Sequence, residues 1–87
     1  MPFLNQMIED HTEGVMTAAG PATFVCVDKK GTLELVAPDG SIAATIKHRE
    51  CGWRVYDREG KTDWEHSWFQ YLSLAKQHAL DGLAKEQ

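Results

Sequence analysis

The sequence predicts an α+β fold: an N-terminal helix, a four-stranded antiparallel β-meander, and a long C-terminal amphipathic helix packed on one sheet face. Apolar residues recur at helical spacing at both ends of the chain. The middle holds short runs rich in β-branched and aromatic residues, separated by turn signals. With 87 residues, of which 43% are hydrophobic and 25% charged, the composition is that of an ordered globular protein. Because so short a chain cannot build two cores, we expect residues 1–87 to form a single domain.

The first segment is predicted to be a helix over about residues 3–18. Pro2 suits a first helical turn, and Gly20-Pro21 is expected to end the helix, because proline cannot continue one. The residues that recur at helical spacing are Leu4, Met7, Ile8, His11 and Val15.

Four strands are predicted between the helices, at residues 23–27, 32–37, 41–48 and 53–56. Asp- and Gly-containing turn signals separate them, which favours antiparallel hairpins. Ile42, Ala44 and Ile46 alternate with Thr45 and Lys47, so one face of the sheet is expected to be apolar and the other polar.

The last segment, residues 62–85, is predicted to be one long helix. Thr62 and Glu65 have the spacing of a capping box at its start, and no glycine or proline interrupts residues 63–81. At 100° per residue one wide face collects Trp64, Trp68, Tyr71, Leu72, Ala75, Ala79 and Leu83.

A competing interpretation divides this segment. It makes residues 64–69 a fifth strand, with Trp64, His66 and Trp68 on one side, and begins the helix near Ser73. Short apolar runs fit either period, so both interpretations stay open, and the long helix is preferred.

The charge distribution limits the function classes. The net charge is −4, with seven basic and five acidic residues in 29–61 and acidic flanks on either side. An acidic total argues against general duplex binding, which depends on Lys and Arg meeting phosphates. A local basic patch remains, however, and single-stranded nucleic-acid binding on the polar sheet face is an alternative function. Its candidate residues are Lys47, Arg54, Tyr56 and Arg58.

The cysteines and histidines suggest a further, weaker candidate function, a metal or thiol site. Cys26 and Cys51 are too few for a disulfide framework, so we expect a reducing, cytoplasmic setting. No apolar run approaches the length that spans a bilayer, and no membrane association is expected. A metal or thiol site would combine Cys51 and His48, three residues apart, with Cys26 and His66. Structural zinc sites use paired short spacings, and only one such pair exists here, so no metal site and no cofactor is predicted.

The preferred function is a small, non-enzymatic protein-binding module. No catalytic motif is present, and six aromatic residues fall within residues 53–71, more than one sheet contact needs. A partner protein or a second copy of the chain is expected to cover the exposed part. Small acidic proteins of this kind are typical of the inhibitors that phages and mobile elements direct at host complexes, anti-CRISPR proteins among them. The predicted interface consists of Trp64, Trp68 and Phe69, with Glu9, Asp10 and Glu13 as acidic contacts or phosphate mimics.

Overall fold

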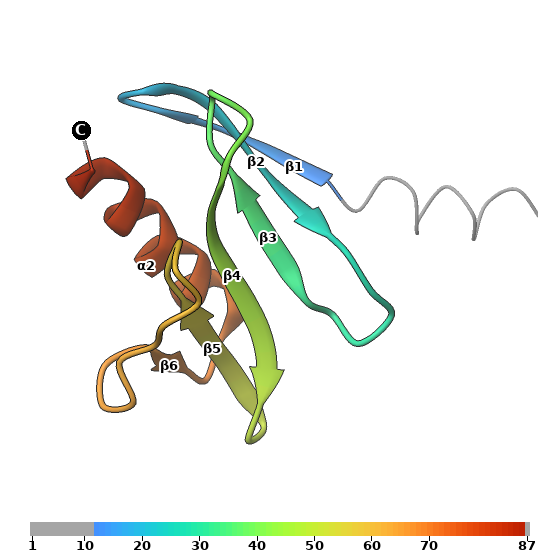
Figure 1. The fold of residues 1–87 in the computed structure, drawn as a ribbon. Coiled ribbons are helices and arrows are strands. Elements are labelled where there is room, and N and C mark those ends of the chain that lie inside the picture. The colour runs from blue at the N-terminus through green and yellow to red at the C-terminus, as the bar shows by residue number, and fades with distance from the viewer. Residues whose placement is uncertain (1–11, 87) are drawn as a thin grey trace, which may run out of the picture.

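The structure is a computed structural model that describes residues 12–86. Within these residues, six consecutive strands form one antiparallel sheet in the order β1-β2-β3-β4-β5-β6, and one helix, α2, lies against one side of it (Figure 1). The elements are β1 (Thr12–Thr17), β2 (Gly20–Cys26), β3 (Leu33–Val36), β4 (Ile42–Arg49), β5 (Gly52–Tyr56), β6 (Trp68–Phe69) and α2 (Leu72–Lys85).

The predicted N-terminal helix is wrong over residues 12–17, which form strand β1 and pair with β2. Residues 3–11 of that prediction lie outside the described residues. The two strands meet at a tight turn, where Thr17 Oγ1 donates to the Gly20 carbonyl and Gly20 has a φ of 122°. Gly20-Pro21 therefore begins a strand, and Val15 packs against the core from strand β1.

The four predicted strands overlap β2, β3, β4 and β5, although β2 begins three residues earlier than predicted. The predicted total of four strands is wrong, because the sheet has six within residues 12–86. Three turns have the same local structure, in which an aspartate side chain accepts a hydrogen bond from a backbone N–H and a glycine with positive φ follows. The pairs are Asp28 with Gly31, Asp39 with Gly40, and Asp57 with Gly60. The fourth turn has both Glu50 (φ 55°) and Cys51 (φ 64°) in the left-handed region, an arrangement that favours asparagine and glycine.

The predicted long helix is also wrong. Residues 64–66 form a turn, Trp68 and Phe69 form β6 beside β5, and α2 begins only at Leu72, as in the competing interpretation. Thr62 caps no helix: its hydroxyl donates to the Val55 carbonyl, and the Val55 N–H donates to the Ser67 carbonyl. Pairing with the edge of β5 thus removes this segment from the helix.

The core lies between α2 and the inner face of the sheet, the face that α2 covers. Phe24, Leu35 and Ile46 are fully buried on adjacent strands, with Phe24 opposite Leu35 in the register. From the helix, Ala75, Ala79 and Leu83 are buried at a spacing of four residues, as the C-terminal part of the predicted apolar face requires. α2 contacts β4, β5 and β6, and an ion pair of 2.9 Å between Lys76 and Glu13 joins it to β1.

Gly52 provides a test of how the edge of the sheet is built. A Cβ at this position would meet the Trp68 indole and lie 2.6 Å from the Phe69 carbonyl oxygen. We predict that Gly52→Ala lowers the free energy of unfolding by about 1–3 kcal/mol, because β6 must move away from β5.

Gly82, inside α2, is the matched control for that substitution. Among residues 12–86, no atom from another part of the chain lies within 4 Å of the position that an alanine methyl group would take there. Gly82→Ala should raise the free energy of unfolding by about 0.5–1 kcal/mol. Urea denaturation of the two variants measures both, and equal stability of Gly52→Ala and the wild type would show that β6 does not pack on β5 as described.

Candidate binding surface

The face of the sheet turned away from α2, here called the outer face, is the first candidate surface of the described residues. Strand alternation and the register assign side chains to it from every strand. One end of the outer face is apolar, with Met16, Pro21, Val36 and Ile42. The other end, called the basic end, carries Lys47, Arg49 and Arg54, with Trp64 and Trp68 beside them.

The apolar end differs from the polar, solvated face that the alternation predicted. The prediction that Ile42 shares a face with Ala44 and Ile46 is wrong, because the pairing of β3 with β4 shifts between Leu35 and Val36 and puts Ile42 opposite Val36.

Met16 is 77% exposed and Ile42 is 44% exposed. Val36 and Ile42 are paired across β3 and β4, and Val36 pairs with Thr23 of β2, so this row contains no charged side chain. Exposed apolar side chains on a sheet face are a recognised feature of surfaces that another protein covers.

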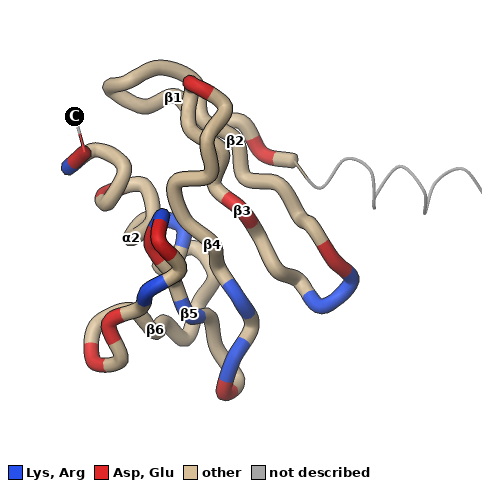
Figure 2. Tube along the Cα trace, in the orientation of Figure 1, with Lys and Arg blue, Asp and Glu red and all other residues tan. Residues whose placement is uncertain are grey.

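The basic end brings together three of the four residues predicted to bind nucleic acid. Lys47 is directly opposite Arg54 in the register, and the Lys47 ammonium lies 5.1 Å from the centre of the Tyr56 ring. An open groove of about 530 Å³ separates the β2–β3 turn from the end of β4. Lys30, Lys47, His48 and Arg49 line it together with Asp28 and Thr32. Figure 2 shows basic residues both on this turn and along the end of β4.

The fourth residue, Arg58, is not part of this group. Its guanidinium forms a 2.9 Å ion pair with Glu86 at the end of α2 and donates to the Ser41 hydroxyl at 2.6 Å. The hydrogen bond with Glu86 raises the pKa of Arg58 above its ordinary value, although both side chains are partly exposed. Arg58 therefore joins the helix end to the turn before β4.

Arg54 is in an unusual environment for a charged side chain. It is only 3% exposed, its Nε and Nη1 are buried without a hydrogen-bond partner among the described residues, and its Nη2 is 3.7 Å from Glu50. The Trp64 ring lies over the guanidinium at 4.2 Å. Each unsatisfied buried donor costs about 1–3 kcal/mol, and a cation–π contact returns about 0.5–2 kcal/mol. The sequence predicted this residue as exposed and gave no signal that Trp64 covers it.

The three aromatic residues of the predicted interface do not share one face. Trp64, 68% exposed, lies on the outer side of the sheet over Arg54. Trp68 lies against Gly52, and its indole N–H donates to the Arg49 carbonyl at 2.9 Å. Phe69 points the other way, packing on the core beside the His78 ring. The continuous aromatic face expected of a long helix is therefore absent from the described residues.

The predicted acidic contacts are only partly described. Glu13 lies on the inner side of β1, where it pairs with Lys76. Glu9 and Asp10 lie outside the described residues. The carboxylate of Glu13, predicted to contact another protein, is therefore already in an ion pair with Lys76 of the same chain.

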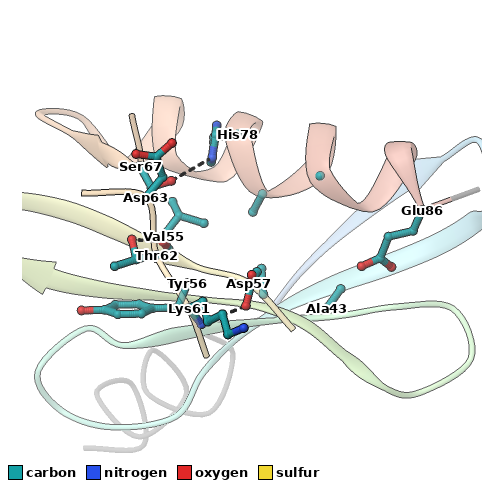
Figure 3. A pocket seen from close by; sticks show the side chains of 13 residues that line it. Ala43, Val55, Tyr56, Asp57, Lys61, Thr62, Asp63, Ser67, His78 and Glu86 are labelled. Carbon is teal, nitrogen blue, oxygen red and sulfur yellow. Dashed lines mark hydrogen bonds between the residues drawn. The ribbon is translucent and has the colours of Figure 1, made fainter. Parts of the chain in front are cut away.

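A second hollow, of about 360 Å³, lies between α2, β4, β5 and the 57–63 segment (Figure 3). Within it the Ser67 hydroxyl and His78 Nε2 are 3.3 Å apart, a pair that sequence reasoning missed because their eleven-residue separation matches no known spacing. Asp63 lines the same hollow, but its carboxylate accepts from the Glu65 and His66 amides and contacts the His66 ring. Ser67 and His78 thus join the turn to the helix, and no orienting carboxylate among the described residues completes a catalytic set with them.

The cysteines and histidines of the metal alternative are dispersed. The His48 ring packs at a tilt against Trp53, Cys51 is exposed in the β4–β5 turn, and the Cys26 thiol donates to the Asp28 carbonyl. His66 pairs with Asp63 at 3.1 Å. Within residues 12–86 no three His, Cys, Asp or Glu side chains are grouped as metal ligands would be.

Comparisons with protein-family models, with curated proteins and with solved structures find no match for this chain. None of the helices in the described part of the chain is long and apolar enough to cross a membrane.

Asp63 provides a pH test of the turn that places Trp64 over Arg54. Hydrogen bonds from the Glu65 amide, and then from the His66 side chain, lower the pKa of Asp63 below its ordinary value of 3.8. A carboxyl whose pKa is lowered in the folded protein stabilises the fold above its unfolded pKa. This contribution is lost as the pH falls through the folded pKa. We predict that the Trp64 indole N–H resonance shifts during acid titration with a midpoint below pH 3.8.

Asp63→Asn should remove that transition, whereas Asp28→Asn, in a separate turn whose aspartate pKa is also lowered, should retain it. Two-dimensional NMR from about pH 6 to about pH 2 follows the three proteins. An unchanged Trp64 titration in Asp63→Asn would show that another group controls the turn.

Proposed function

We propose that the protein is a non-enzymatic binding module that docks a partner protein on the outer face of its sheet. The observation that carries the proposal is the exposure of Met16 and Ile42 on a face with an uncharged row across three strands. Water solvates such side chains poorly, so covering them with a partner is favourable by about 25 cal/mol per Å² of apolar area removed from water.

The charge of the same face indicates the kind of partner. The basic end adds Lys47, Arg49 and Arg54 to the apolar end, with Glu34 and Glu50 as its nearby acids. Because electrostatic complementarity orients proteins as they meet, a partner surface with apolar residues and carboxylates fits this arrangement best. Inhibition of a host complex, in a cytoplasmic setting, remains the biological role that we propose for such docking.

We predict that Ile42→Glu and Met16→Glu abolish partner binding, because each places a carboxylate in the contact. Leu74→Glu is the control: Leu74 is also exposed, but it lies on α2, away from the outer face. Crosslinking and affinity capture from the native host, followed by mass spectrometry, compare the variants, and circular dichroism verifies their folding.

The decisive result is a crosslinked partner that contacts the outer face and is lost only with Ile42→Glu and Met16→Glu. A partner lost with Leu74→Glu instead would place docking on the helix and refute the proposal. A dimer that the same two substitutions dissociate would assign the outer face to a second copy of the chain.

Single-stranded nucleic-acid binding is a second candidate, favoured by the position of Lys47 over Tyr56 beside the groove with Lys30 and Arg49. For nucleic-acid binding, the ammonium groups of Lys30 and Lys47 and the guanidinium of Arg49 hold phosphates while the Tyr56 ring stacks on a base.

For this candidate we expect Lys47→Ala to weaken binding of a fluorescent oligothymidine and to reduce the salt slope by about one. Tyr56→Ala should cost about 1–3 kcal/mol through lost stacking. Arg58→Ala is the control and should change nothing, since Glu86 and Ser41 already engage Arg58. Anisotropy that is unaffected by these substitutions, or absent binding, excludes this function.

A further inference from the structure

We infer that Arg54 is the receptor for a single carboxylate of the partner protein, and that Trp64 covers this receptor in the free protein. This inference rests on the proposed docking function and specifies its chemistry. Arg54 Nε and Nη1 are buried donors without acceptors, and the only carboxylate within 4 Å of the guanidinium, among residues 12–86, is Glu50 at 3.7 Å. An oxygen acceptor at this point would satisfy donors that the fold itself leaves unpaired.

The charges around Arg54 strengthen the argument. Lys47 is directly opposite Arg54 across β4 and β5, and like charges in that relation destabilise a sheet. Glu50, in the turn between these two strands, has a largely exposed side chain that lies 3.7 Å from the guanidinium. The site therefore has an excess of positive charge that one additional anionic group would balance.

Trp64 is placed to act as a removable cover. Its ring contacts Arg54 at 4.2 Å while 68% of the residue remains exposed, so its packing involves mainly one side. The turn that carries it is attached separately, through Thr62 and Ser67 to the backbone of Val55. The indole can consequently rotate away and expose the guanidinium while these two hydrogen bonds persist.

The surroundings favour a protein carboxylate over a phosphate chain. Beside Trp68, with which it is paired in the register, Arg54 offers a single guanidinium, which matches one carboxylate in size and hydrogen-bonding pattern. The outer face continues from Arg54 towards Tyr56 and Thr45 and then to the apolar row. A peptide segment that has apolar residues and one acidic residue would therefore contact both the apolar row and Arg54.

The test uses two synthetic peptides of alternating Val and Ser that differ at one central position, which is Glu in one peptide and Gln in the other. Heteronuclear NMR of the full chain monitors the Arg54 Nε–H and Trp64 indole N–H signals during titration. We expect the Glu peptide to bind at least about tenfold more tightly and to shift both signals. Trp64→Ala should tighten binding of the Glu peptide several-fold, because the competing cover is gone, and Tyr71→Ala, another exposed aromatic, should not.

Arg54→Gln should abolish the preference for Glu over Gln, and Arg54→Lys, which keeps the charge, should restore only part of it. If Arg54→Gln does not fold, the Trp64→Ala result decides alone, since mere loss of packing would not tighten binding. Equal affinity for the two peptides, or an Arg54 signal that responds to oligothymidine and not to the Glu peptide, overturns the inference. Partner capture that still depends on Ile42 would then leave the docking function standing without its carboxylate receptor.

Discussion

The backbone of Val55 holds residues 62–67 against β5, and most of the architecture near the C-terminus depends on this attachment. Its carbonyl accepts from the Thr62 hydroxyl and its N–H donates to the Ser67 carbonyl. Because both ends of the segment are fixed to one residue, the chain between them must turn and cannot continue as a helix. Trp68 then lies against Gly52 as part of a sixth strand, α2 begins at Leu72, and Trp64 lies over Arg54.

The two faces of the sheet differ because α2 packs on only one of them. On the inner face Ala75 and Ala79 of α2 allow the helix to approach closely, and the core is complete without any side chain from the outer face. The side chains of the outer face are therefore not needed to form the core. Their exposure varies widely, from an exposed Ile42 to a buried Arg54. A sheet that needs only one face for its stability can use the other for binding.

Sequence reasoning located β2 to β5, because turn signals with aspartate and glycine act locally and the register of each hairpin follows from its turn. It failed for residues 12–17 and 62–71, where the apolar spacing suits a helix as well as a strand. At β1 the partner strand decides the conformation, and at 62–71 the free edge of β5 does. Among the site residues, the alternation of side chains along the strands correctly placed Lys47, Arg54 and Tyr56 on one face. The burial of Arg54 and the ion pair between Arg58 and Glu86 depend on segments that are distant in the chain.

The local features of this protein can be read directly from its amino acids: the turns, the alternation within β3 and over Ala44–Lys47 of β4, and the face of α2 that carries Ala75, Ala79 and Leu83. These follow from the stereochemistry of a few neighbouring residues. The position of Ile42 on the outer face is not among them, because it depends on a shift in the pairing of β3 with β4. The strand at Thr12–Thr17, the late start of the helix and the cover of Trp64 over Arg54 emerge only when the chain is folded. Each of these is a choice between conformations of similar local energy, and contacts between segments that are far apart in the sequence make that choice.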